Sequence, residues 1–101
     1  MSYSIKSYSR AKAEKLGVVI KPSTVSGKKI DVFNKKGDKL ASIGAIGYGD
    51  YPTFMAEKGK AFADEKRRLY KLRHEKDRHV RGSAGFYADQ LLWLTIIILS
   101  I

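Results

Sequence analysis

The chain has 101 residues, with 20 Lys or Arg and 10 Asp or Glu, so its formal net charge is +10. This length supports one small domain with a modest core. The excess of cations indicates a polyanionic partner, which can be nucleic acid, an anionic membrane surface or an acidic protein. Cysteine is absent, which excludes disulfides and thiolate metal sites.

Residues 1–17 are basic and polar, and they contain no apolar segment typical of a secretory signal peptide. The stretch from Arg10 to Gly17 predicts a short helix closed by the glycine. A helix of this length is marginal in isolation, so its order can depend on a partner. We therefore interpret residues 1–17 as a basic N-terminal arm.

Residues 18–45 predict a small antiparallel sheet. Ile30 and Val32 fall on one face of a predicted strand, and Asp31 and Phe33 fall on the other. The sequence from Asn34 to Asp38 is typical of a turn, and residues 39–45 supply the returning strand. Residues 18–20 predict a third strand, which would help because an isolated hairpin is barely stable.

The segment from Gly44 to Pro52 is rich in glycine and precedes the next predicted helix. Its glycine spacing differs from the dinucleotide fingerprint. We interpret it as a sheet-to-helix turn, with a phosphate cradle as the alternative. Tyr48 and Tyr51 flank the end of this loop and are expected to cap the core, although such rings can also stack on bases.

Residues 53–78 predict a basic helix with a break near Gly59. From Lys58 to Arg81 there are ten Lys or Arg and four Asp or Glu, and ten minus four leaves +6. These cations can follow a phosphate backbone, or they can belong to a solvated face with local ion pairs. The candidate contacts with an anion or nucleic acid are Lys66, Arg67, Arg68, Lys71, Arg73, His74, Arg78 and Arg81. Among them, Arg67, Lys71 and His74 are spaced to line one helix face.

No pattern of catalytic or metal-binding residues stands out. His74 and His79 are five positions apart and do not share a helix face, so they do not form a metal site. No nucleophile elbow or triad pattern is present. We therefore expect no enzymatic activity, no cofactor and no small-molecule substrate.

Ser83 is a suitable N-cap for a helix that runs through Trp93. Beyond Trp93 the apolar run is consistent either with a strand or with continuation of this helix. Nine of the eleven residues from Leu91 to Ile101 are large and apolar, a run too short to cross a bilayer, which takes about 20. We expect the first three to join a core made of Ile30, Val32, Ile43, Phe62, Leu69 and Leu72. The expected contacts with a partner chain or membrane are Trp93, Leu94, Ile96, Ile97, Ile98, Leu99 and Ile101.

Four short motifs occur in a characteristic order. The residues concerned are Lys21, Pro22 and Ser23; Gly47, Asp50 and Tyr51; Arg67, Tyr70, Arg73 and His74; and Ala84, Gly85, Phe86, Leu92 and Trp93. In this order the chain resembles a family of small basic proteins encoded by large double-stranded DNA viruses of algae and amoebae. The resemblance covers about residues 18–93 and implies a virion setting, with a capsid, an inner membrane and packaged DNA.

Together these observations predict an α+β fold. A small antiparallel sheet (about 18–45) packs against a basic helix (about 53–78) and a C-terminal helix or strand. Residues 18–93 form the domain and residues 94–101 an apolar tail. The leading functional hypothesis is a structural protein of the virion, located in the capsid interior or between capsid and membrane, inside the infected host cell. As a minor capsid component in many copies, it would link other virion proteins, the inner membrane or DNA. The alternative is a sequence-neutral nucleic-acid-binding protein.

Overall fold

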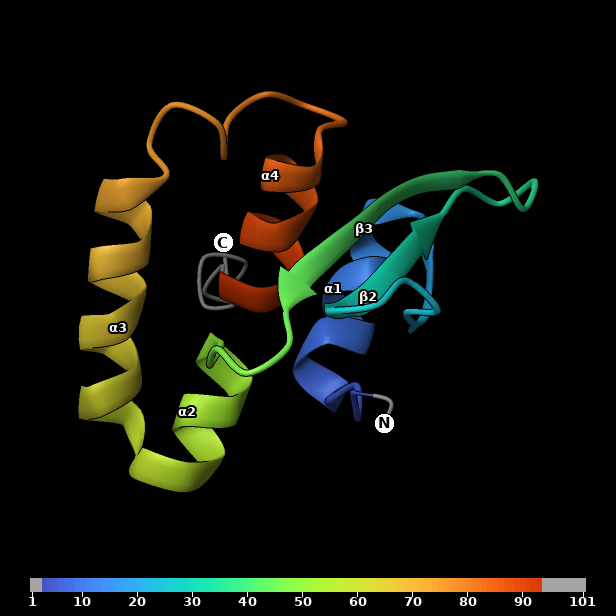
Figure 1. Cartoon of the computed structure of the whole chain (residues 1–101). Helices are drawn as coiled ribbons and strands as arrows, with labels where there is room; N and C mark the ends of the chain where they lie inside the picture. The colour runs from blue at the N-terminus through green and yellow to red at the C-terminus, as the bar shows by residue number, and fades with distance from the viewer. Residues whose placement is uncertain (1–2, 94–101) are drawn as a thin grey trace.

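The computed structural model of the chain describes residues 3–93 and confirms the α+β class (Figure 1). A three-stranded sheet lies on one side, and α4 and η1 lie between the sheet and the long helix α3. In chain order the elements are α1 (Ser7–Leu16), β1 (Val19–Pro22), β2 (Lys28–Phe33), β3 (Lys39–Ala45), α2 (Tyr51–Lys58), α3 (Lys60–Arg73), α4 (Ala84–Ala88) and η1 (Asp89–Trp93).

The sheet is antiparallel throughout, in the order β1-β2-β3, as predicted. Ile30 lies opposite Ile43, and Val32 lies opposite Ile20, so the apolar side chains of the three strands share the core face. At the β2–β3 turn the side-chain oxygen of Asn34 accepts hydrogen bonds from two backbone amides, which closes the turn.

Helix α1 packs against the core. The Ser9 hydroxyl donates to the carbonyl oxygen of Leu91 at 2.6 Å, and Ala13 is buried beside it. Gly17 ends the helix in the left-handed region, with φ of 74°. Residues 7–16 therefore belong to the domain itself, where the sequence had suggested an arm ordered by a partner.

The predicted helix over residues 53–78 is two helices, α2 and α3, separated at Gly59. Gly59 has φ of 91°, a conformation that disfavours other residues, so the break expected there is confirmed. Helix α3 ends at Arg73, and residues 74–82 form turns.

The buried face of α3 differs from the predicted one. Phe62 and Leu72 are 40 % and 66 % exposed, whereas Ala63 and Tyr70 are buried. The prediction that Phe62 and Leu72 belong to the core was wrong. The large ring of Tyr70 takes their place because it packs against Trp93.

The end of the described chain forms the centre of the core. Ser83 caps α4, accepting a hydrogen bond from the Phe86 amide at 3.1 Å, as predicted. A π-helical turn, η1, follows directly and buries Leu91, Leu92 and Trp93. Burying each leucine stabilises the fold by roughly 1.5–3 kcal/mol.

Candidate functional site

Two of the predicted contact residues point into the fold. Arg67 donates from Nε to the Trp93 carbonyl oxygen at 2.9 Å, and its guanidinium lies 3.6 Å from the centre of the Tyr51 ring. Arg78 lies 3.6 Å from the buried carboxylate of Asp89. Both arginine side chains are only 15 % exposed. They stabilise the interior, so the face predicted from Arg67, Lys71 and His74 is not a continuous outer surface.

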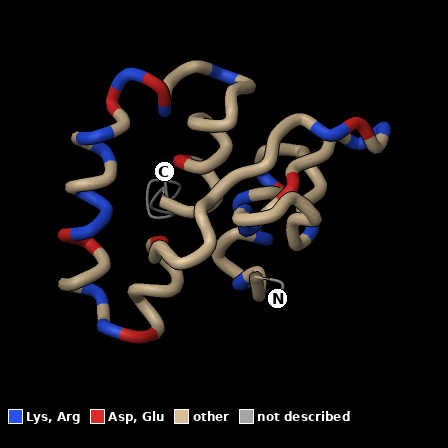
Figure 2. Tube along the Cα trace, viewed as in Figure 1, with Lys and Arg blue, Asp and Glu red and all other residues tan. Residues whose placement is uncertain are grey.

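Other cations of this region pair with neighbouring acids. Arg68 makes two hydrogen bonds to Glu65 on the outer side of α3, and Lys60 pairs with Asp64 at 2.6 Å. Lys71 is half-buried, and burial lowers its pKa. Figure 2 shows acidic residues among the Lys and Arg along α3 and in the turn after it. The pairs of Arg68 and Lys60 fit the interpretation of a solvated face with local pairs, whereas Lys71 makes no ion pair with a carboxylate of residues 3–93.

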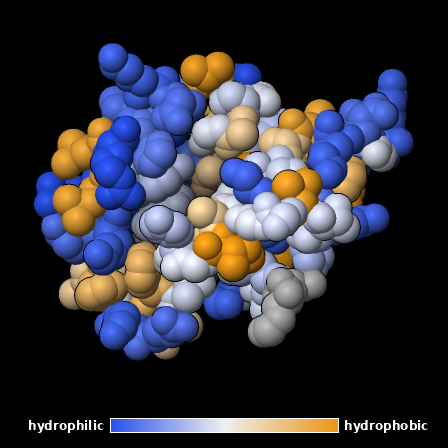
Figure 3. Space-filling view, in the orientation of Figure 1, coloured by the Kyte–Doolittle hydropathy of each residue, from blue (hydrophilic) through white to orange (hydrophobic). Residues whose placement is uncertain are grey.

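Lys66 and Arg73 behave differently from these paired cations. Within residues 3–93, neither has a carboxylate within ion-pair distance, and the same holds for Arg81. The Lys66 ammonium lies 5.4 Å from the centre of the Phe62 ring, and Arg81 lies 5.4 Å from that of Phe86. Figure 3 shows hydrophilic side chains gathered over α3 and, at the other end of this face, over the β2–β3 turn.

Lys66, Arg73 and His74 line a pocket of about 400 Å³ between α3, η1 and the loop that follows β3. Opposite these residues, Tyr48 and Gly49 form the loop side of the pocket. The residues that line it include four cationic or imidazole groups and four aromatic rings, but no carboxylate. The pocket is therefore suited to a ligand that is both anionic and partly apolar.

An aromatic stack forms one wall of the pocket. The rings of Trp93 and Tyr70 are 4.5 Å apart and nearly parallel, and His74 stacks on the other side of Tyr70 at 4.4 Å. The ring centres of Phe54 and Trp93 are 6.2 Å apart. Burial, with a smaller contribution from nearby Asp89, raises the pKa of Tyr70 to about 12, so its hydroxyl is neutral at physiological pH.

A buried ion pair holds the pocket loop. Lys29 Nζ lies 2.9 Å from an Asp50 carboxylate oxygen, and it also donates to the Tyr48 carbonyl oxygen at 2.5 Å. Asp50 caps α2 by accepting from the Thr53 amide at 3.0 Å, and it accepts from the Tyr3 hydroxyl at 2.7 Å. These bonds fix the position of Tyr48 relative to β2 and α2.

The electrostatics of Asp50 follow from these contacts. Burial alone raises the pKa of its carboxyl, but hydrogen bonds from Lys29, Thr53 and Tyr3 outweigh that effect, so the pKa lies below its usual value. Gly49 is required beside it because a Cβ atom there would overlap the ring of Phe54. Gly49 is thus needed because the backbone approaches the Phe54 ring closely. The glycine conformations predicted for this loop occur at Gly44 and Gly47, whose φ angles are 78° and 95°.

The two tyrosines of this loop have different surroundings. Tyr51 is buried, and its hydroxyl donates to Asp64 at 2.8 Å, so it contributes to the core as expected. Tyr48 is 76 % exposed at the mouth of the pocket and does not cap the core. The alternative interpretation of Tyr48, as a ring available for stacking, fits this position.

The predicted partner contacts lie mostly beyond the described residues. Trp93 alone among them is described, and it is 8 % exposed, so the structure places it in the core. The others, outside residues 3–93, are Leu94, Ile96, Ile97, Ile98, Leu99 and Ile101.

Residues 3–93 contain no cluster of His, Cys, Asp or Glu that could hold a metal ion. In the same part of the chain, no helix has the length and apolar character needed to cross a membrane. Comparison with protein-family models, with curated proteins and with solved structures finds no match. The resemblance to small proteins of large DNA viruses therefore stays a prediction.

Proposed function

We propose that this protein binds nucleic acid without reading its base sequence. The binding surface, called the pocket surface below, consists of Tyr48, Phe54, Lys66, Arg73 and His74. The observation that carries the proposal is that Lys66 and Arg73, without a carboxylate partner among residues 3–93, line one pocket with the exposed Tyr48 and the half-buried Phe54. Cations combined with aromatic rings are typical of surfaces that bind single strands.

The charge of the whole chain supports the same conclusion. A net charge of +10 attracts polyanions at long range, and unpaired cations are the groups that displace counterions from phosphates. Helix α3 carries no Asn or Gln, the side chains that recognise adenine through two hydrogen bonds. Binding through contacts with the phosphate backbone requires only a polyanionic strand and predicts little discrimination among sequences.

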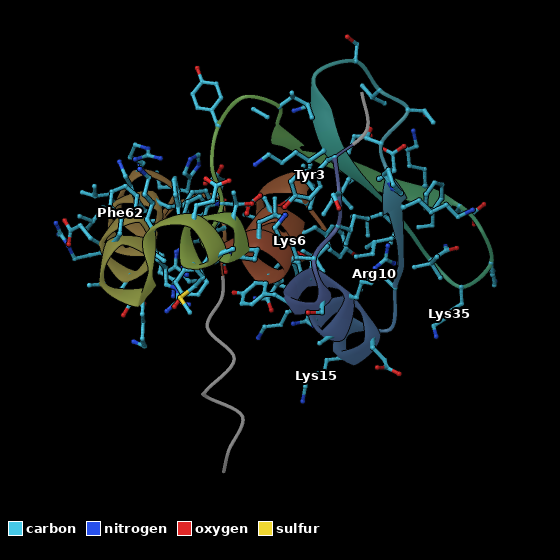
Figure 4. The ribbon with its side chains drawn as sticks, turned by 90° about the horizontal axis from the view of Figure 1, so that it is seen from below. Tyr3, Lys6, Arg10, Lys15, Lys35 and Phe62 are labelled. Carbon is cyan, nitrogen blue, oxygen red and sulfur yellow. The ribbon has the colours of Figure 1, made fainter. Side chains whose placement is uncertain are left out.

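The test is the salt dependence of binding to a fluorescently labelled oligonucleotide, measured by anisotropy. For single strands the logarithm of the binding constant falls with the logarithm of the salt concentration, with a slope of about 0.7 per phosphate contact. The double variant Lys66→Ala with Arg73→Ala should therefore reduce the magnitude of this slope by about 1.4. A matched control is Lys35→Ala with Lys36→Ala, which removes the same charge from the β2–β3 turn. Figure 4 shows Lys35 at the opposite end of the molecule from Phe62 on α3.

We expect the control pair to retain most of the wild-type slope, and oligonucleotides of unrelated sequence to bind alike. An absence of binding at low salt would refute the proposal. So would an equal loss of slope in both double variants, because binding would then depend on net charge and not on the pocket surface. Circular dichroism checks that each variant is folded.

The virion hypothesis is a second proposal, carried by a different observation. The core of the described domain takes Leu91, Leu92 and Trp93, and six further large apolar residues follow them in the sequence. In this role the protein is a minor capsid component whose residues 94–101 contact neighbouring proteins or lipid. Deletion of residues 96–101 should reduce self-association in sedimentation experiments, and an unchanged sedimentation profile would contradict this role.

A further inference from the structure

The pocket has the size of a small-molecule site. Its volume of about 400 Å³ lies within the range of about 300–1,000 Å³ that is usual for ligand pockets. An extended phosphate backbone alone does not require such a volume, because surface cations can contact phosphates without a cavity. The pocket therefore indicates a ligand group that enters the fold.

The chemistry of the walls specifies that group. Leu69, Leu92 and the ring of Phe54 supply apolar surface, which a bare anion would leave uncovered. Lys66 and Arg73 supply positive charge, and no acidic residue lines the pocket. A ligand with a flat apolar ring joined to an anionic group satisfies both requirements, and a nucleotide has this composition.

Tyr48 provides a place for a base to stack. Its ring is 76 % exposed at the mouth of the pocket, and no aromatic ring of residues 3–93 stacks on it. The neighbouring backbone is held by the Lys29–Asp50 pair, so little freedom of the loop is lost when a ligand binds. By contrast, Tyr70 already has a ring on each side and serves as a wall.

We propose that this pocket binds one unpaired nucleotide, with its base against Tyr48 and Phe54 and its phosphate at Lys66 and Arg73. The inference rests on the proposed function and specifies its ligand: single-stranded nucleic acid is preferred over duplex, because a paired and stacked base does not enter a pocket without being extruded. The same chemistry occurs in a free nucleotide, and the experiment below separates the two sources.

Trp93 is the single tryptophan of the chain and lines the pocket, so its fluorescence reports occupation directly. The full-length protein is titrated with adenosine monophosphate, adenosine, inorganic phosphate, a single-stranded oligonucleotide and the matching duplex, with correction for absorbance by the bases. We expect the single strand to change the emission of Trp93 at lower concentration than the duplex. Adenosine monophosphate should compete with it more strongly than adenosine or phosphate.

Two variants of an exposed residue provide the structural control. Tyr48→Ala removes the stacking ring and should weaken binding of the single strand by about 5- to 150-fold, whereas Tyr48→Phe retains the ring and should bind nearly as the wild type does. Because Tyr48 is exposed, neither variant is expected to unfold the protein.

The outcomes separate the two proposals. Salt-dependent binding with equal affinity for single strand and duplex, an unchanged emission of Trp93 and no effect of Tyr48→Ala would overturn the pocket while leaving nucleic-acid binding intact. Binding of adenosine monophosphate without binding of any oligonucleotide would support the pocket as a site for free nucleotides and overturn the proposed function.

Discussion

Replacing Asp50 by Asn tests whether the buried pair with Lys29 holds the pocket loop. The Lys29 and Asp50 residues are 4 % and 0 % exposed, so each charge depends on the other for compensation. In Asp50→Asn the side-chain oxygen can still accept from the Thr53 amide, but an amide nitrogen replaces the oxygen that accepts from Tyr3 and Lys29, so the ammonium of Lys29 loses its counter-charge. Breaking a buried ion pair on one side costs about 3–5 kcal/mol.

This loss is large compared with the total stability of a small domain, which is about 5–15 kcal/mol. The assay is equilibrium unfolding in urea at pH 7, followed by the fluorescence of Trp93. Asp38→Asn, in the exposed β2–β3 turn, is the control and should change the free energy of unfolding by less than about 0.5 kcal/mol. Lys29→Met combined with Asp50→Asn should recover part of the loss, because neither charge then remains buried.

A loss below about 1 kcal/mol in Asp50→Asn would refute the reasoning, because the Lys29 charge would then be compensated by water or by another group. The double variant also has a functional consequence. Without the bond to the Tyr48 carbonyl oxygen, the loop is less fixed, so nucleotide binding should weaken even where stability is restored.

Three further predictions follow from buried groups. Burial raises the pKa of Asp31, but hydrogen bonds from Ser23, Ser42, the Thr24 amide and Lys39 outweigh that effect and hold the pKa below its usual value. The contribution of Asp31 to stability should therefore be constant above about pH 5 and be lost as the pH drops further, and Asp31→Asn should flatten this decline. Burial raises the pKa of Asp89 and outweighs the opposite effect of Arg78, which keeps its pair with Glu75 when Asp89 is neutral. Asp89→Asn should therefore increase the free energy of unfolding at pH 7, by an amount that shrinks toward about pH 4. Gly49→Ala should displace Phe54, lowering both the Tm and the nucleotide affinity, and Phe54→Leu should relieve the overlap.

Each of these has a result that would contradict it. For Asp31 it is an acid decline in urea titrations that is equally steep in wild type and variant. For Asp89 it is a destabilised variant at pH 7, which would show that the charged form is favoured inside the fold. For Gly49 it is a thermal unfolding curve that coincides with that of the wild type.

The parts of the fold that depend on local chemistry could be predicted from the sequence. The turn after β2 follows from Asn34 and Gly37, the break at Gly59 from its missing side chain, and the start of α4 from Ser83. The burial of Leu91 and Leu92 followed from their apolar character.

The site could be predicted only in part, because it depends on which side of α3 faces inward. Phe62 and Leu72 were the natural choices for a buried face, but Tyr70 fills the interior by stacking on Trp93, and Arg67 turns inward to the Tyr51 ring. With Tyr70 and Arg67 facing inward, Lys66 and Arg73 lie at the pocket. Their positions in the sequence do not distinguish them from neighbouring cations that pair with acids.

The Lys29–Asp50 pair was missed for a different reason. The two residues are 21 positions apart, and only the folded sheet and loop bring them together. The sequence did contain one usable signal, since Asp50 followed by Tyr-Pro-Thr is typical of a helix N-terminus. That signal identifies the cap of α2 but not its partner on β2.

The most direct test of the central claim is a titration of the isotopically labelled protein with a short single-stranded oligonucleotide, followed by NMR chemical shifts. If nucleic acid binds at the pocket surface, the largest changes should fall on the indole N–H of Trp93, the amides of Tyr48 and Gly49, and the side chain of His74. Changes concentrated on the β2–β3 turn or on α1, with the indole signal unmoved, would contradict it.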